Sequence, residues 1–170
     1  MTLRRALAWA FALVSIAALV AFAPAATAAQ PRAYVQPGTY QIEFGTSSFG
    51  EVLTEPWDAT PGTPVVLLPR GEGAQVWVIA RKGRGYTIQS AQTGHYLGVR
   101  VEPGHHRLAV ITPQPHTWTL DTTPRADRVH IASGQFRLDR SPLLIFPPRV
   151  DVQQAREGIS QEWQLTRIGG

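Results

Sequence analysis

Histidine is the residue type in this sequence that could most readily act in catalysis or bind a metal. Two of the histidines, His105 and His106, are adjacent, and the other three are isolated: His95, His116 and His130. A metal site needs several ligands held at a regular spacing, whereas adjacent side chains on a strand or turn diverge. We therefore expect His105 and His106 to lie in a solvated turn, with no metal site and no cofactor.

None of the common catalytic motifs is present in the chain. It has no G-x-S-x-G nucleophile elbow, no H-E-x-x-H zinc motif and no cysteine nucleophile. Paired carboxylates for glycoside hydrolysis have no recognisable pattern either. We therefore predict that the protein is not an enzyme and that its function is binding.

A proline-rich stretch, Leu53 to Pro64, has the composition of a rigid surface loop. Its three prolines fix the backbone angle φ, so the loop loses less freedom when it binds a partner. Ordering a flexible segment would cost about 0.5–1.5 kcal/mol for each immobilised side chain. The stretch contains no Arg or Lys, and its large apolar residues are Leu53 and Trp57. We expect an extended, braced loop whose binding residues are Thr54, Glu55, Pro56, Trp57, Asp58 and Ala59.

Two arginines provide an alternative binding site. Arg140 precedes Ser141 and Pro142 between the predicted tenth and eleventh strands, and Arg149 follows two prolines in the predicted final long loop. Exposed arginines are usually only solvated. These two lie in loops where a cation would be offered to a partner.

The spacing of three tryptophans indicates which strands hold these loops in place. Trp77, Trp118 and Trp163 are 41 and 45 residues apart, and each is followed two positions later by an apolar or β-branched residue. A period in this range indicates repeated structural units, and alternation with period two indicates strands that bury one face. We expect all three indoles to lie in one core, because burial of an indole is strongly favourable.

Each unit is predicted to contain four short strands separated by turns rich in Gly, Pro and Ser. No helical periodicity appears after residue 28. The expected strands are Thr39–Phe44, Phe49–Thr54, Val65–Leu68 and the Trp77 strand; Tyr86–Ile88, Tyr96–Val99, Leu108–Ile111 and the Trp118 strand; and Val129–Ile131, Gln135–Leu138, Leu143–Phe146 and the Trp163 strand.

Twelve strands in three units predict an all-β fold, a β-trefoil with three pseudo-symmetric four-strand repeats at about residues 36–80, 81–124 and 125–168. In this fold six strands close a barrel and six form three hairpins that cap it. A propeller also has four strands in each blade, but three blades are fewer than propellers use.

Residues 1–28 have the pattern of a secretory signal peptide. Arg4 and Arg5 supply the positive charge, Ala6–Phe22 is apolar, and Ala26–Ala28 resembles a cleavage site. A membrane anchor is the alternative, but the apolar stretch is shorter than the roughly 20 residues of a membrane span. We expect a single domain over residues 29–170, secreted to the extracellular space, and the scarcity of Lys beside Arg suggests a bacterial source.

The net charge bears on which partners the protein can bind, and the cysteine content on how its fold is stabilised. Without Arg4 and Arg5, 14 basic and 12 acidic residues remain, a net charge of +2. This balance does not favour nucleic-acid binding. With no cysteine there are no disulfides, so the core alone must stabilise a chain of this size. After removal of the leader we expect a monomer that does not associate with a membrane.

Two of the three repeats have a Gln two positions before the tryptophan, in Gln75-x-Trp77 and Gln161-x-Trp163. This motif resembles the QxW signature of ricin-type lectins. In the lectins this signature belongs to the core, and the sugar is held by an Asp early in each repeat, an aromatic side chain and often an Asn. Leu97-Gly98 has Gly at the Asp position, only Leu138-Asp139 keeps the Asp, and the chain contains no Asn. A carbohydrate-binding module therefore remains the alternative function.

A broader resemblance extends from Gly38 to Arg167 and rests on the segments Pro64–Gly71, Val76–Ile79, Gly85–Ile88 and Glu162–Arg167. In these segments the chain resembles the mycospin-type serine protease inhibitors of mushrooms. The resemblance implies a rigid surface loop offered to a serine protease as a substrate-like segment, which in trypsin-directed members lies between the second and third strands. Trypsin requires a long cation in its S1 pocket. Because the loop here has none, a protease with an apolar S1 pocket is the expected partner.

Overall fold

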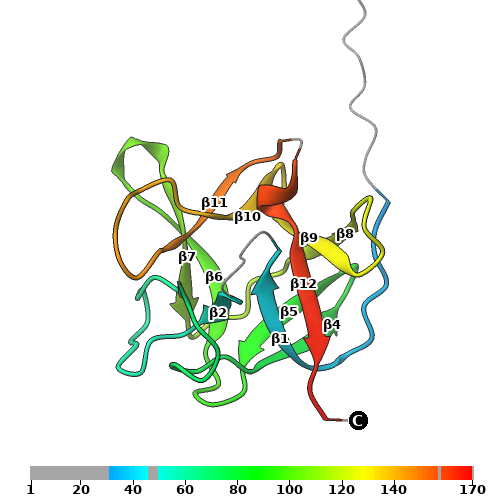
Figure 1. Ribbon diagram of the computed structural model, residues 1–170, viewed down its shortest axis with the longest axis horizontal. Helices are drawn as coiled ribbons and strands as arrows, with labels where there is room; N and C mark the ends of the chain where they lie inside the picture. The colour runs from blue at the N-terminus through cyan, green and yellow to red at the C-terminus, as the bar shows by residue number, and fades with distance from the viewer. Residues whose placement is uncertain (1–30, 46–49, 157, 170) are drawn as a thin grey trace, which may run out of the picture.

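The computed structural model describes residues 31–45, 50–156 and 158–169, so the predicted leader lies outside the described part of the chain. The described residues form twelve strands and two short 3₁₀ helices (Figure 1). The strands are β1 (Gly38–Phe44), β2 (Val52–Thr54), β3 (Val66–Leu68), β4 (Trp77–Lys82), β5 (Gly85–Ser90), β6 (Tyr96–Val101), β7 (Arg107–Thr112), β8 (Thr119–Thr122), β9 (Arg128–Ser133), β10 (Phe136–Arg140), β11 (Val150–Gln154) and β12 (Trp163–Arg167); the helices are η1 (Pro103–His105) and η2 (Ile159–Gln161). No helix in these residues is long and apolar enough to cross a membrane.

Six of the strands close into a barrel. Antiparallel ladders join β1 to β4, β4 to β5, β8 to β9, β9 to β12 and β12 back to β1. The remaining contact, between β5 and β8, is made by Tyr86 and Trp118, whose backbone groups exchange two hydrogen bonds of 2.8 Å. Closure pairs each barrel strand on both sides and so leaves no free sheet edge in the barrel.

The other six strands form three hairpins, β2–β3, β6–β7 and β10–β11. The hairpins also touch one another, because Asp151 pairs with Leu108, Pro64 with Val110 and Val66 with Arg149. A six-stranded barrel with three hairpins is the arrangement of a β-trefoil. The predicted fold class is therefore confirmed.

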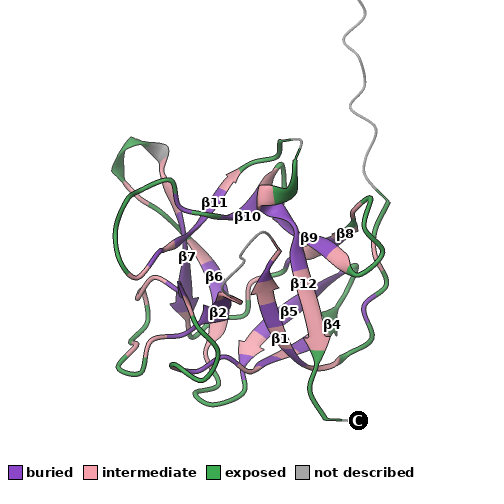
Figure 2. Ribbon diagram, in the orientation of Figure 1, coloured by how far each residue is buried: buried purple, intermediate pink, exposed green. Residues whose placement is uncertain are grey.

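The three repeat tryptophans occupy equivalent places in the core. Trp77, Trp118 and Trp163 are fully buried, and each indole N–H donates to a main-chain carbonyl oxygen of the second strand in its own repeat. The acceptors are Leu53 (2.9 Å), Leu97 (2.9 Å) and Leu138 (3.0 Å). Figure 2 shows the buried residues concentrated on the strands and the exposed residues concentrated in the connecting loops. Each repeat therefore satisfies the polar atom of its indole in the same way.

The prediction of the eleventh strand at Leu143–Phe146 was wrong, because β11 lies at Val150–Gln154. Its alternation buries Val150 and Val152, and Val152 pairs with Leu138 of β10. The run at 143–146 is apolar but lies between prolines, which cannot donate the hydrogen bonds of a ladder. Consequently Arg140 and Arg149 flank one loop, between β10 and β11, and Arg149 is not in the final loop.

The predicted second strand, Phe49–Thr54, is shorter in the structure. β2 begins at Val52, and Phe49 lies outside the described residues. Its three residues are all buried and pair with β3 through Val52–Leu68, Leu53–Leu67 and Thr54–Val66. The strand therefore ends where the proline-rich stretch begins.

Candidate functional site

Two loops from different repeats lie side by side and form the candidate site. We call residues 55–65, between β2 and β3, the proline-rich loop, and residues 141–149, between β10 and β11, the apolar loop. Backbone hydrogen bonds join the adjoining chain segments: the Leu67 N–H donates to the Pro148 carbonyl (2.8 Å) and the Val150 N–H to the Val65 carbonyl (3.1 Å). In Figure 1 the apolar loop is the orange segment next to the cyan-green proline-rich loop.

The base of the proline-rich loop is buried and firmly anchored. Thr54 and Glu55 have no exposed surface. The Glu55 carboxylate accepts hydrogen bonds from the Thr93 hydroxyl (2.8 and 2.9 Å) and lies 3.1 Å from the His95 Nδ1, so it ties the loop to the turn between β5 and β6. Its backbone also pairs with Ala74 in both directions. Thr54 and Glu55 therefore hold the loop in place and do not face a partner.

The outer part of the proline-rich loop is folded into two consecutive turns. The Ala59 N–H donates to the Pro56 carbonyl (3.1 Å), and the Thr63 N–H to the Thr60 carbonyl (2.9 Å). Backbone bonds of Gly62 and Thr63 to Ile111 of β7 add support from the next repeat. The loop is braced, as its prolines predict, but it is turned where an extended segment was expected.

Of the predicted contact residues in this loop, Trp57 and Asp58 are exposed, and Pro56 and Ala59 are half-buried. The Trp57 side chain is 65% exposed. Leu53, the other large apolar residue of the stretch, lies in the core with no exposed surface. The surface that this loop offers is therefore centred on Trp57.

The apolar loop carries the most exposed large apolar side chains among the described residues. Leu144 and Phe146 are 104% and 88% exposed, and Leu143 and Ile145 are 50% and 39% exposed. Sequence reasoning placed these four residues in a strand and so missed them. The signal that could have identified them is Pro142 before the run and two prolines after it, which together interrupt a ladder.

A hollow of about 290 Å³ separates the two loops. Its walls include Pro56 and Pro64 from the proline-rich loop, and Ile145, Phe146 and Arg149 from the apolar loop. Arg149 is half-buried, whereas Arg140 is exposed and lies 3.4 Å from a carboxylate oxygen of Glu51. The two predicted alternative contacts therefore stand at the two ends of the apolar loop.

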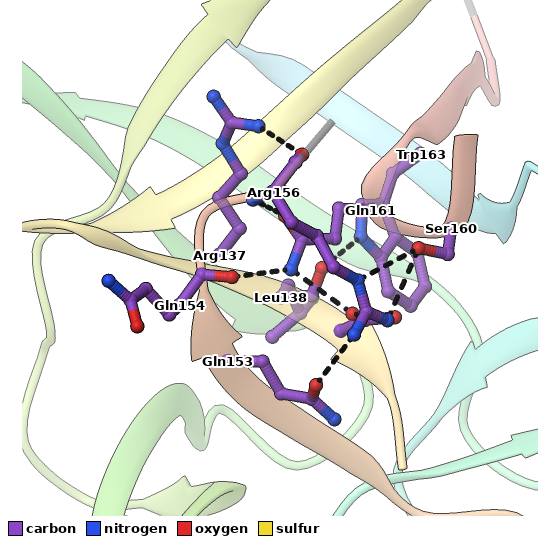
Figure 3. Close-up of polar contacts among 9 residues, drawn as sticks. Arg137, Leu138, Gln153, Gln154, Arg156, Ser160, Gln161 and Trp163 are labelled. Atoms are coloured by element: carbon purple, nitrogen blue, oxygen red, sulfur yellow. Dashed lines mark hydrogen bonds and ion pairs between the residues drawn. The ribbon is translucent and has the colours of Figure 1, made fainter. Parts of the chain in front are cut away.

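In the third repeat, the Asp that matches the lectin pattern is bound by other side chains of the protein. Asp139 is buried, and one of its carboxylate oxygens accepts hydrogen bonds from Arg156 (2.6 Å) and Gln161 (3.1 Å). Figure 3 shows Arg156 held in turn by Ser160 and Gln153, at 3.3–3.4 Å. Burial raises the pKa of the Asp139 carboxyl above its ordinary value, and the contacts of Gln161 and Arg156 offset this only in part.

The equivalent positions in the other repeats have no carboxylate. In the first repeat Gln75 donates to the Thr54 hydroxyl (3.1 Å). In the second repeat the position is Gly98, where a Cβ atom would lie 2.4 Å from the Thr112 Cγ2. The second repeat therefore has no space for the Asp side chain that the lectin pattern places at this position.

No three His, Asp or Glu side chains gather closely enough to hold a metal ion in the described part of the chain. Two histidines each lie beside one buried carboxylate: the His95 Nδ1 is 3.1 Å from Glu55, and the His106 Nε2 is 3.4 Å from Asp151. His116, the residue that replaces the repeat glutamine, lies 3.0 Å from the Ser133 hydroxyl. The predicted solvated turn at His105–His106 is the short helix η1 and the residue that follows it.

Comparison with known proteins finds similarity in structure only. No family model matches the chain, and no curated protein matches its sequence. Among solved structures, a ricin B-like lectin of Macrolepiota procera in complex with lactose has a TM-score of 0.67 at 23% identity, covering 80% of this chain and 100% of the lectin.

Two other solved structures have similar scores. A proteinase inhibitor from Coprinopsis cinerea has a TM-score of 0.61 at 15% identity, covering 79% of this chain and all of the inhibitor. The designed threefold-symmetric protein ThreeFoil has a TM-score of 0.64 at 17% identity, covering 77% of this chain and 99% of the design. Both of the families that the sequence resembles, lectins and protease inhibitors, thus have similar structures. By its strand order, its threefold core and these likenesses, the chain is a β-trefoil.

Proposed function

We propose that the protein is a secreted, monomeric inhibitor of serine proteases that acts through rigid surface loops. The observation that carries the proposal is the pair of joined loops, which presents Trp57 and residues 143–146 as exposed apolar groups on a hydrogen-bonded support. Exposed apolar side chains in a row, such as those of residues 143–146, are typical of a site that binds another protein.

The anchoring of the loops supports inhibition by a preformed segment. Glu55, Thr63 and Val65 tie the proline-rich loop to neighbouring repeats, and Pro148 ties the apolar loop to β3. A loop that is already ordered loses little conformational entropy on binding, and this increases its affinity. The buried residues Thr54 and Glu55 serve this support, while Trp57 and Asp58 remain available for contact.

The side chains at the loop tips favour proteases with an apolar S1 pocket. Neither residues 56–64 nor residues 142–148 include an Arg or a Lys. A trypsin-like pocket requires a long cation, and here only Arg140 and Arg149, at the ends of the apolar loop, could supply one. Chymotrypsin-like and subtilisin-like enzymes are therefore the expected partners.

Inhibition assays with the purified mature protein test the proposal directly. Trypsin, chymotrypsin, elastase and subtilisin form the panel. We expect stronger inhibition of chymotrypsin and subtilisin than of trypsin. Absence of inhibition across the whole panel would contradict the proposed function.

Carbohydrate binding is the second candidate, favoured by the Gln161–Asp139 pair of the third repeat. This pair keeps the lectin-like Asp beside the QxW glutamine. Against it, Arg156 already binds the carboxylate. Retention on polysaccharide columns, combined with no inhibition in the protease panel, would favour this candidate over the first.

Export is proposed from the leader pattern, residues 1–28. The expected mature N-terminus is Ala29. N-terminal sequencing of protein from culture supernatant should find this residue or a close neighbour. Recovery of chains that retain Met1 would contradict the proposal.

A further inference from the structure

We propose that the apolar loop, residues 141–149, is the segment that enters the protease cleft, and that Leu144 occupies the primary specificity pocket. This inference rests on the proposed function and names the part of the surface that performs it. It assigns the role to the β10–β11 loop, whereas the sequence resemblance points to the β2–β3 loop.

The exposure of Leu144 is the first reason. Its side chain is 104% exposed at the tip of the loop, and Leu143 and Phe146 are exposed on either side. Leucine and phenylalanine are usually buried, so four consecutive exposed apolar residues need a binding partner to account for them. Trp57, the equivalent apolar group of the proline-rich loop, stands alone in its loop.

The backbone of the two loops is the second reason. A substrate-like segment pairs with its protease through main-chain groups, as an added strand does. In the proline-rich loop the carbonyls of Pro56, Thr60 and Thr63 already accept hydrogen bonds within the protein. Between Leu143 and Phe146 the described main-chain bonds are those of the Ile145 N–H to the Leu143 carbonyl (2.9 Å) and of the Leu143 N–H to the Ser141 hydroxyl (3.3 Å), so neither involves the main-chain groups of Leu144 or Phe146. The apolar loop therefore keeps more main-chain groups for a partner.

The ends of the apolar loop are clamped, which is the third reason. The Ser141 N–H donates to the Arg149 carbonyl (2.9 Å), and Pro148 and Val150 bond to β3 and to the residue before it. If a protease hydrolyses the Leu144–Ile145 bond, one water is added and the new carboxyl and amino ends stay held beside each other. Because the two new ends are held close together, the reverse step is favoured, in which the peptide bond forms again and water is released. Clamping therefore suits an inhibitor, whereas insertion of the tip into a lipid surface does not require it.

Three variants test the assignment. Leu144→Asp places a charge in the apolar pocket, and Leu144→Arg offers the cation that trypsin requires. Ile159→Asp is the matched control, because Ile159 is an exposed apolar residue (45%) on η2, outside both loops. Melting temperatures should be unchanged for all three.

We expect Leu144→Asp to weaken the inhibition of chymotrypsin or subtilisin roughly 30-fold or more, as loss of a central contact residue does. Leu144→Arg should lose the same inhibition and acquire inhibition of trypsin. Ile159→Asp should inhibit as the wild type does. After long incubation with the protease, mass spectrometry should find cleavage between Leu144 and Ile145.

The outcomes separate this inference from the proposed function. If the wild type inhibits no protease of the panel, the proposed function fails, and this inference fails with it. If the wild type inhibits but both Leu144 variants inhibit equally well, with cleavage inside residues 56–64, this inference alone is overturned. Binding of the wild type to phosphatidylcholine vesicles that is lost in Leu144→Asp, without any protease inhibition, would assign the loop to a lipid surface and overturn both.

Discussion

At the scale of single residues, the three core tryptophans illustrate how one side chain supports a repeat. Each indole is fully buried, and its N–H donates to the carbonyl oxygen of Leu53, Leu97 or Leu138. Phe44 also packs against Trp163, with ring centroids 5.5 Å apart. The packing and the hydrogen bond therefore act together in every repeat.

Replacing any of these tryptophans should strongly destabilise the fold. We expect each of Trp77→Ala, Trp118→Ala and Trp163→Ala to lower the free energy of unfolding by about 3–5 kcal/mol, because a large cavity is left in the core. Denaturant titration of the three variants measures the effect. A variant that unfolds at the wild-type denaturant concentration would contradict the equivalence of the three positions.

His116 makes the second repeat sensitive to pH. Burial lowers the pKa of its imidazole below the ordinary value of 6.5, and the charge of Lys82 lowers it further. The unfolded chain therefore binds a proton at a higher pH than the folded protein does. Stability should fall as the pH drops through 6.5 towards the folded-state pKa and level off below it.

The variant His116→Gln, which restores the glutamine of the other repeats, should remove this dependence. At about pH 8, where His116 is neutral, the stabilities of the wild type and the variant serve as the reference. At about pH 5 the wild type should have lost stability relative to the variant. Thermal or denaturant unfolding across this range is the measurement. Parallel pH profiles for the two proteins would contradict the prediction.

At the scale of elements, a buried carboxylate provides the side-chain anchor at the base of the proline-rich loop. Glu55 connects the end of β2 to the turn before β6 through Thr93 and His95. The connection spans two repeats, so it positions the loop relative to the rest of the surface. A buried carboxylate that loses a donor is costly.

Removing either side of this contact should loosen the loop. We expect Glu55→Gln and Thr93→Val each to cost about 1–3 kcal/mol of unfolding free energy. The double variant should cost less than the sum of the two, because both changes remove one interaction. Hydrogen exchange at the Ala59 and Thr63 amides should accelerate in each variant. Strictly additive energies would show that the two residues do not act together.

The β6–β7 hairpin contains a close approach that admits no side chain. At Gly98 a Cβ atom would meet the Thr112 Cγ2 at 2.4 Å. We expect Gly98→Ala to destabilise the protein by about 1–3 kcal/mol through overpacking. The double variant Gly98→Ala, Thr112→Ser removes the opposing methyl group and should recover much of the loss. Melts in which Gly98→Ala matches the wild type would contradict this account.

At the scale of the whole molecule, the barrel joins the three repeats into one folding unit. β12 closes the barrel by pairing with both β1 and β9, so the first and third repeats share a sheet. The three tryptophans belong to one hydrophobic core. No repeat buries its apolar face without the other two.

We expect the protein to unfold in a single cooperative step. Tryptophan fluorescence, which reports on the core, and far-UV circular dichroism, which reports on the strands, should give the same denaturation midpoint. A chain limited to residues 36–80 should not fold, since its apolar face would lack the other two repeats. Separate midpoints for the two signals would indicate repeats that unfold independently.

The sequence by itself determined the architecture. The spacing of Trp77, Trp118 and Trp163 predicts three units, and the alternation around each predicts a strand with one buried face. Both signals are local, because every second residue of a strand points to the same face, so an apolar residue at every second position marks the buried face. The prolines of residues 53–64 likewise predicted a braced loop, and the Gly at position 98 already showed that the second repeat lacks the Asp of the lectin pattern.

Only the tertiary structure decided which residues reach the surface at the candidate site. The burial of Glu55 depends on Thr93 and His95, almost 40 residues away. The position of β11 depends on its pairing with β10 and β7, which an apolar run at Leu143–Phe146 cannot reveal. The neighbouring position of the two loops follows from the contact of Val66 with Arg149, in different repeats. Local patterns carry no information on such pairings, because they form between hairpins and turns of different repeats that only the folded structure brings together.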